Sequence, residues 1–142
     1  MAQPNEDDAR TGDPDAALPL TPAVFHIMLS LADGERHGYS IMREVERYTD
    51  GALRLGPTTL YRSIRQMLAS GFIEEADARP DPALDDERRR YYRLTKYGRQ
   101  VALAETRRLE RLVARARATS FGGEIRGARI TSPGLEGLGG LS

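Results

Sequence analysis

The chain has 142 residues, no cysteine, and 21 basic against 21 acidic side chains. This length suits one domain, and the lack of cysteine excludes disulfides, thiolate metal sites and cysteine nucleophiles. No apolar stretch is long enough to span a membrane and the acidic N-terminus is unlike a secretory signal, so we expect a soluble cytoplasmic protein.

The neutral total charge is unevenly distributed along the chain. Residues 1–17 carry five acidic side chains and one arginine, a net charge of −4, and residues 122–142 carry two of each sign. The central part, residues 18–121, therefore has a net charge of +4. Of its basic residues only Lys96 is a lysine, and arginine is the better bidentate ligand for phosphate and guanine.

The N-terminal part predicts a tail followed by a helix. Residues 1–17 are polar, acidic and contain proline, which is typical of disorder. A first helix is expected to begin at Thr21 and Pro22, which suit the N-cap and the first helical position, and to end before Gly34. This helix is apolar nearly all round, so one side should face its own domain and another side a partner chain. The residues assigned to that partner-facing side are Phe25, Met28 and Leu29.

Two shorter helices follow, and the later one carries candidate nucleic-acid contacts. Residues 39–49 have one apolar stripe and predict the second helix. The third helix is predicted over residues 57–70 with Gly56 as its N-cap. At about 100° per residue, Arg62 points almost directly away from the apolar stripe of this helix. Helix N-termini also attract phosphate. The candidate contacts on the third helix are Thr58, Thr59, Tyr61, Arg62, Arg65 and Gln66.

These residues also have structural interpretations. The two arginines and Gln66 would then form an ordinary solvated face, the two threonines would fill the first helical turn, and Tyr61 would pack on the second helix. The place of the third helix directly before a basic hairpin favours DNA contact for Arg62 and Arg65.

That hairpin is predicted by residues 72–76 and 89–94, which alternate like two antiparallel strands. Residues 77–87 form a long loop between them. Tyr92 is in phase with Leu94 and is expected in the core. Three arginines beside the hairpin tip are expected to contact phosphate or the minor groove, with solubility as the alternative interpretation. They are Arg88, Arg89 and Arg90.

The last predicted helix spans residues 95–118, roughly 35 Å at 1.5 Å per residue. The rest of the domain is too small to cover a helix of this length. Its apolar stripe is therefore expected to pair with the same helix of a second subunit. The stripe consists of Leu109, Leu112, Val113 and Ala116. Residues 122–142 are rich in glycine and serine and predict a flexible tail.

The sequence predicts no metal site, no cofactor and no enzymatic activity. His26 and His37 are its only histidines, whereas a zinc site needs three or four ligands in a defined geometry. His37 is expected in the turn before the second helix. The chain shows no cluster of acid, base and nucleophile. Between the first helix and the C-terminal helices, Phe25, Met28 and Leu29 have two interpretations: they line a pocket for a small ligand, or they belong to the core of the interface with the partner chain.

Four pieces of the sequence resemble the PadR family of transcriptional regulators. Their order and spacing match the family over residues 18–118. The pieces are His37-Gly38-Tyr39-Ser40-Ile41, Thr59-Leu60-Tyr61, Leu68-Ala69-Ser70-Gly71-Phe72-Ile73-Glu74, and Arg90-Tyr91-Tyr92-Arg93-Leu94-Thr95 with Gly98. The resemblance implies a mostly α winged helix-turn-helix protein of the compact branch, with a single C-terminal dimerisation helix. It also implies a homodimeric repressor responsive to small aromatic or other hydrophobic molecules, and the family motif favours a DNA role for Tyr61.

Together these features predict a sequence-specific DNA-binding regulator. Residues 1–17 would be a tail, 18–95 the winged helix-turn-helix domain, 96–121 the dimerisation helix and 122–142 a second tail. A homodimer would bind double-stranded DNA at an inverted repeat with half-sites about one or two helical turns apart. The alternative is a winged-helix module that binds another protein. The neutral total charge supports this alternative, as do four acidic residues in the hairpin loop, Asp81, Asp85, Asp86 and Glu87.

Overall fold

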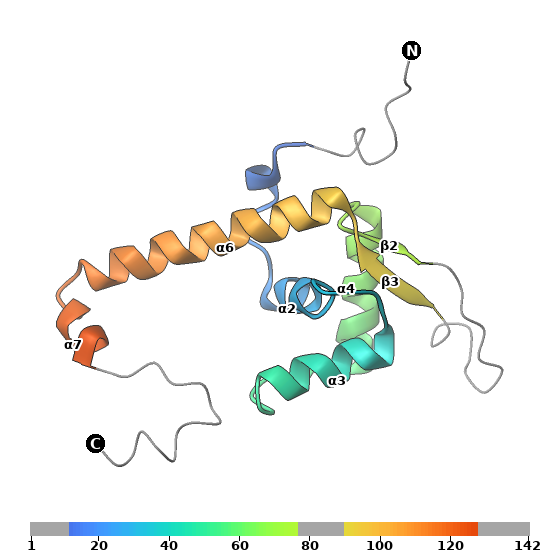
Figure 1. Cartoon of the computed structure of the whole chain (residues 1–142), viewed down its shortest axis with the longest axis horizontal. Coiled ribbons are helices and arrows are strands. Elements are labelled where there is room, and N and C mark those ends of the chain that lie inside the picture. The colour runs from blue at the N-terminus through green and yellow to red at the C-terminus, as the bar shows by residue number, and fades with distance from the viewer. Residues whose placement is uncertain (1–11, 77–89, 128–142) are drawn as a thin grey trace. The chain divides into compact units, whose positions relative to one another are not determined.

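The computed structural model describes residues 12–76 and 90–127, and the chain divides after Glu105 into two compact units. Figure 1 shows the helices and strands in chain order. The elements are the 3-10 helix η1 (Pro14–Ala17), α2 (Pro22–Ser30), β1 (Arg36–His37), α3 (Gly38–Tyr48), α4 (Pro57–Ala69), β2 (Ile73–Glu75), β3 (Tyr91–Leu94), α6 (Lys96–Arg117) and α7 (Gly122–Gly127).

The four predicted helices are present, and local capping explains where they begin and end. The Thr21 hydroxyl accepts a hydrogen bond from the Val24 N–H at 3.2 Å, directly before Pro22 opens α2. Gly56 is the N-cap of α4 and offers no side-chain hydrogen bond to its first turn. Gly71 follows the end of α4 with φ at 77°, a conformation that glycine adopts without strain.

The prediction of two unstructured tails is wrong for the residues of each tail that lie nearest the central domain. Residues 14–17 form η1, which is capped by Asp13 accepting from the Asp15 N–H at 3.0 Å, and Ala17 packs against the core. Residues 122–127 form α7, with the Ile125 N–H donating to the Phe121 carbonyl at 3.1 Å. Local hydrogen bonds order both segments, and the contact of Ala17 with the core adds to the order of η1. The remaining parts of the predicted tails lie outside the described residues.

A three-stranded antiparallel sheet with the order β1-β3-β2 lies beside the helices of the first unit. Ile73 of β2 faces Leu94 of β3, and Arg36 of β1 faces Tyr92. Tyr92 is buried, as its phase with Leu94 predicts. The sequence analysis missed β1, because a two-residue strand is too short to show alternation.

The core of the first unit is formed where α2, α3 and α4 pack against one another and receive the beginning of α6 (Figure 1). Its largest buried side chains include Ile27, Ile41, Leu60 and Met67. Met28 is also fully buried in this core, so its assignment to a surface facing a partner chain is wrong. A helix that is apolar nearly all round gives no sequence signal for which apolar side turns inward. Phe25 is half-buried, and Leu29 is 42% exposed.

The second unit, residues 106–142, contains the C-terminal part of α6 and the short α7. Two residues of the predicted stripe are large, apolar and about half exposed: Leu112 at 52% and Val113 at 48%. Leu109 and Ala116 are partly buried. None of the helices within the described residues combines the length and the hydropathy that crossing a bilayer requires.

Candidate nucleic-acid interface

The exposed face of α4 carries two arginines that are free of partners in the described part of the chain. Arg62 and Arg65 are both exposed, and neither forms a hydrogen bond or an ion pair with another described residue. Thr58 is exposed, and Thr59 is half-buried in the first turn. Because Gly56 supplies no side-chain cap, the N–H groups of this turn can receive an anion.

Tyr61 lies on the flank of α4 and packs against the start of α3. A Cβ atom at position 38 would lie only 2.8 Å from the Tyr61 hydroxyl oxygen, so Gly38 is what lets the ring approach. The half-buried ring therefore makes the contact expected from its structural interpretation. This contact holds α4 against α3.

Gln66 is exposed on the other flank of α4. Its side chain borders a cavity that is also lined by Ser70 and Met67. Gln66 thus lies between the arginine-bearing face of α4 and this cavity.

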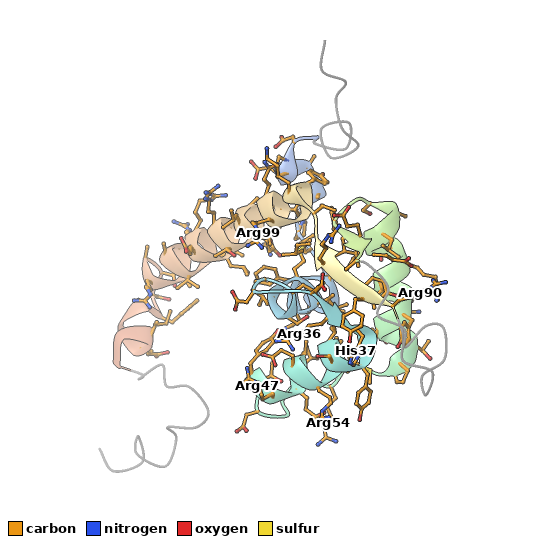
Figure 2. The ribbon with its side chains drawn as sticks, turned by 45° about the vertical axis from the view of Figure 1, so that its right-hand side comes forward. Arg36, His37, Arg47, Arg54, Arg90 and Arg99 are labelled. Carbon is orange, nitrogen blue, oxygen red and sulfur yellow. The ribbon has the colours of Figure 1, made fainter. Side chains whose placement is uncertain are left out.

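The base of the hairpin carries paired charges. Arg90 is exposed (Figure 2), and its Nη1 atom lies 3.3 Å from a Glu75 carboxylate oxygen. The Nε of Arg93 donates to Glu74 at 2.9 Å. Exposed ion pairs of this kind are worth little in free energy, so a phosphate can replace either carboxylate. Arg88 and Arg89 lie outside the described residues.

His37 joins the start of α3 to the sheet: it is the last residue of β1, so its predicted place in a turn is wrong. Its Nδ1 atom accepts a hydrogen bond from the Ser40 N–H at 3.1 Å and so caps α3. Its ring meets that of Tyr91 edge to face, with the centroids 5.4 Å apart. Within the described residues no group of three or more histidine or carboxylate side chains could hold a metal ion.

The structure adds a basic hollow on α3 that the sequence analysis did not assign. It measures about 460 Å³ and is lined by Arg36, His37, Tyr39, Ser40, Arg43, Glu44 and Arg47. Tyr39 is 51% exposed, and the Arg43 guanidinium lies 5.8 Å from the centre of its ring. The spacing of residues 39, 43 and 47, one helical turn each, was the available sequence signal.

Glu44 partly neutralises this hollow, which Arg36 and Arg47 also line (Figure 2). Its carboxylate accepts from the Nε of Arg47 at 3.1 Å and lies 3.6 Å from the Nη2 of Arg36. The hydrogen bond from Arg47, with the positive charges of Arg36 and Arg47, holds the pKa of Glu44 below its usual value against the opposing effect of burial. Glu44 is therefore ionised at neutral pH.

The part of the chain that forms these helices and the hairpin matches a known protein family. A model described as the transcriptional regulator PadR-like family matches residues 27–104, more than half of the chain. The chain belongs to the PadR-like family. This match confirms the resemblance seen in the four sequence pieces. It indicates a regulator of transcription rather than an enzyme.

Solved structures similar to this PadR-like regulator support the fold. A transcriptional regulator from Clostridium thermocellum superposes with a TM-score of 0.58 at 22% identity, covering 69% of this chain and 89% of its own. RosR of H. salinarum, in a complex structure, gives 0.52 at 24% identity, covering 75% and 97%. These likenesses confirm the mostly α winged-helix fold class. No protein with a curated description matches the chain significantly.

Proposed function

We propose that this PadR-like regulator binds double-stranded DNA by placing α4 in the major groove. The observation that carries the proposal is the pair of free guanidinium groups of Arg62 and Arg65 on the exposed face of α4. In this binding mode both arginines reach base edges or phosphates. Thr58, Thr59 and the N-terminal amides of α4 contact the phosphate backbone.

The flanking contacts come from both sides of α4. On the hairpin side, Arg88, Arg89 and Arg90 bind the phosphate backbone of the DNA. On the α3 side, Tyr39 and Arg43 contact another phosphate. Gln66 contributes at the edge of the interface. Tyr61 acts by fixing α4 against Gly38 and contributes little direct contact.

We also propose that the protein acts as a homodimeric repressor. Leu112 and Val113 expose neighbouring apolar side chains on α6 and form the centre of a dimer contact, flanked by Leu109 and Ala116. Phe25 and Leu29 of α2 form a separate contact with the partner chain. Two-fold symmetry then requires an inverted repeat with half-sites about one or two helical turns apart, and a small hydrophobic effector would release the dimer from it.

The decisive experiment selects genomic fragments bound by the purified protein at about 150 mM salt, a concentration at which non-specific binding is weak. The double variant Arg62→Ala/Arg65→Ala is tested in parallel. We expect the wild type to enrich an inverted repeat and the double variant to enrich nothing while its circular dichroism stays unchanged.

The matched control is Arg107→Ala/Arg111→Ala, which removes the same charge from exposed positions of α6. This control should enrich the same repeat as the wild type. Equal loss of enrichment in both double variants would show that overall charge causes the effect. Enrichment of the repeat by the Arg62/Arg65 variant would show that the interface lies elsewhere than on α4. A wild type that enriches no fragment would favour a protein partner instead of DNA.

A further inference from the structure

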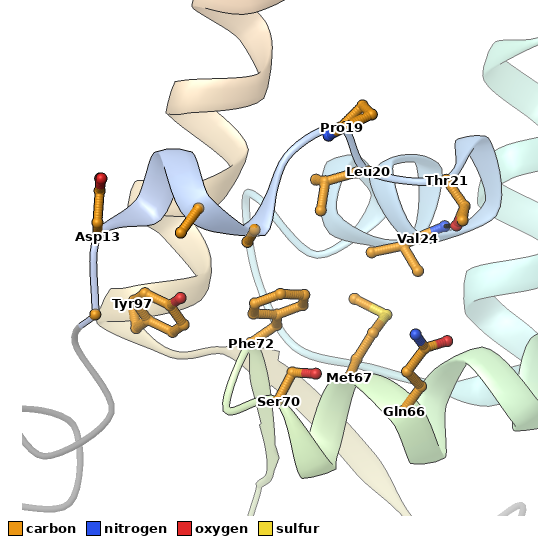
Figure 3. Close-up of a pocket in the computed structure, with 13 residues that line it drawn as sticks. Asp13, Pro19, Leu20, Thr21, Val24, Gln66, Met67, Ser70, Phe72 and Tyr97 are labelled. Carbon is orange, nitrogen blue, oxygen red and sulfur yellow. Dashed lines mark hydrogen bonds between the residues drawn. The ribbon is translucent and has the colours of Figure 1, made fainter.

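The N-terminal segment of the described chain, residues 12–21, lies across a cavity from the C-terminal end of α4 (Figure 3). The cavity has a volume of about 420 Å³, and its lining includes Asp13 from the segment and Gln66 from α4. Gln66 follows Arg65 directly and lies one helical turn after Arg62. The segment therefore brings the N-terminal end of the chain beside the arginine-bearing face of α4.

Contacts with the first unit hold this N-terminal segment in place. Glu105 of α6 is only 2% exposed and accepts a hydrogen bond from the Leu20 N–H at 3.2 Å. Ala17 packs against the core, and Asp13 caps η1. The fold thus sets the point from which residues 1–11 extend.

The N-terminal end of the chain and the exposed face of α4 have opposite charge. Residues 1–15 carry five acidic side chains and one arginine. Asp13 and Asp15 are exposed, and neither forms an ion pair with another described residue. Arg62 and Arg65 are likewise exposed without an ion pair among the described residues. The other three acidic residues are consecutive and make up an acidic stretch before the segment: Glu6, Asp7 and Asp8.

The acidic stretch is close enough along the chain to reach both arginines. It lies four to six residues before Gly12. An extended chain spans up to about 3.6 Å per residue, so this separation corresponds to roughly 14–22 Å. Arg62 lies four residues before Gln66 on α4, about 6 Å at 1.5 Å per residue. The chain is therefore long enough for the stretch to contact the arginines while the N-terminal segment keeps its observed place.

We propose that the acidic stretch binds Arg62 and Arg65 when no DNA is present and competes with DNA phosphates for them. The stretch is tethered at Gly12, so its local concentration at α4 is about millimolar. Exposed ion pairs are individually weak and are screened by salt, so DNA that makes additional contacts displaces the stretch. The competition rests on the proposed function, whereas the binding of the stretch to α4 does not depend on DNA.

Binding of the acidic stretch to α4 can be measured without DNA. The chain contains no cysteine, so Gln3→Cys carries a single spin label in the full-length protein. The label should broaden the NMR signals of the Arg62 and Arg65 amides. In the same labelled chain, Glu6→Gln/Asp7→Asn/Asp8→Asn should restore these signals, because the tether is unchanged and only the charge is removed.

Two outcomes of the labelling experiment would overturn the proposal. Equal broadening before and after neutralisation would show that tethering alone brings the label near α4. Broadening at Lys96, an exposed cation at the start of α6, without broadening at Arg62 and Arg65 would place the stretch elsewhere.

The competition with DNA is tested with the unlabelled triple variant Glu6→Gln/Asp7→Asn/Asp8→Asn. It should bind the selected DNA about fivefold more tightly than the wild type at about 50 mM salt, and less than about twofold more tightly at about 200 mM, because salt screens the ion pairs. The matched control Glu110→Gln/Glu124→Gln/Glu136→Gln removes the same charge from the second unit. This control should gain less than about twofold at either salt concentration.

An equal gain in the control would overturn the competition, because overall charge would then cause it. Unchanged DNA affinity in the triple variant would also overturn the competition. Circular dichroism verifies that each variant is folded. Failure of every protein to bind DNA would overturn the proposed function, and the labelling experiment would still decide whether the acidic stretch binds α4.

Discussion

Thr95 and Gly98 join the hairpin to α6 at a contact that has no room for another side chain. The Thr95 hydroxyl donates to the Gly71 carbonyl oxygen at 2.5 Å and accepts from the Gly98 N–H at 2.9 Å. A Cβ atom on Gly98 would lie 1.9 Å from the carbonyl oxygen of Phe72. The start of α6 is thereby seated directly on the turn between α4 and β2.

We expect Gly98→Ala to lower the free energy of unfolding by about 2–3 kcal/mol, because backbone rather than a flexible side chain must move. Chemical denaturation followed by circular dichroism measures this change. The matched control is Gly34→Ala, where an added Cβ would meet no atom within 4 Å. Similar losses in both variants would contradict the steric explanation.

The side chains of His26 and Tyr48 form a second contact of this kind, which joins α2 to α3. Their rings stack with centroids 5.6 Å apart, and a hydrogen bond of 2.5 Å joins His26 Nδ1 and the Tyr48 hydroxyl. Burial lowers the pKa of His26. Burial, followed by the charge of Glu44, raises the pKa of Tyr48 to about 12. Both side chains are therefore neutral in the folded protein at pH 7.

The lowered pKa of His26 makes stability depend on pH. The unfolded chain binds a proton near the ordinary histidine value of 6.5, whereas the folded chain binds it only at lower pH. Stability should therefore decline as the pH falls through 6.5, until the folded protein is also protonated. We expect His26→Gln to flatten the decline of Tm between pH 7.5 and 5.5. Parallel curves for wild type and variant would show that another group causes the decline.

At the scale of elements, an acidic residue of α3 neutralises part of the positive charge on this helix. Glu44 pairs with Arg36 and Arg47, so only part of the charge on this helix can meet a phosphate. In the proposed binding mode, this pairing limits non-specific attraction to DNA, and sequence discrimination depends more on Arg62 and Arg65 of α4.

We expect Glu44→Gln to strengthen DNA binding and to steepen its salt dependence. The slope of log K against log salt should change by about 0.9 for each additional phosphate neutralised. Fluorescence anisotropy of labelled DNA over a salt series measures both quantities. Glu110→Gln removes the same charge from an exposed position of α6 and should leave the slope unchanged. Equal effects of the two substitutions would exclude a specific role for α3.

At the scale of the whole molecule, the proposed dimer depends on the exposed apolar residues of the second unit, Leu112 and Val113. We expect Leu112→Asp/Val113→Asp to sediment as a monomer that keeps its helical circular dichroism. At about 100° per residue, Arg111 and Ala114 point away from these residues, so Arg111→Asp/Ala114→Asp is the control and should remain a dimer. A persistent dimer in the first variant would place the interface elsewhere.

The sequence by itself determined the order of the helices, the hairpin and the family. Thr21, Pro22, Gly56 and Pro57 are local signals that act within one helical turn, so the helices they open could be recognised without knowing what surrounds them. The apolar stripe of α4 likewise defined which side of that helix leaves Arg62 exposed.

Only the tertiary structure decided which neighbours fill the space around each element. Met28 turned out to belong to the core, Tyr61 to pack on Gly38, and the residues before Thr21 to cover a cavity beside α4. These outcomes depend on contacts between residues far apart in the chain. Periodicity and capping are set by neighbours in sequence, whereas burial and cavities are set by neighbours in space.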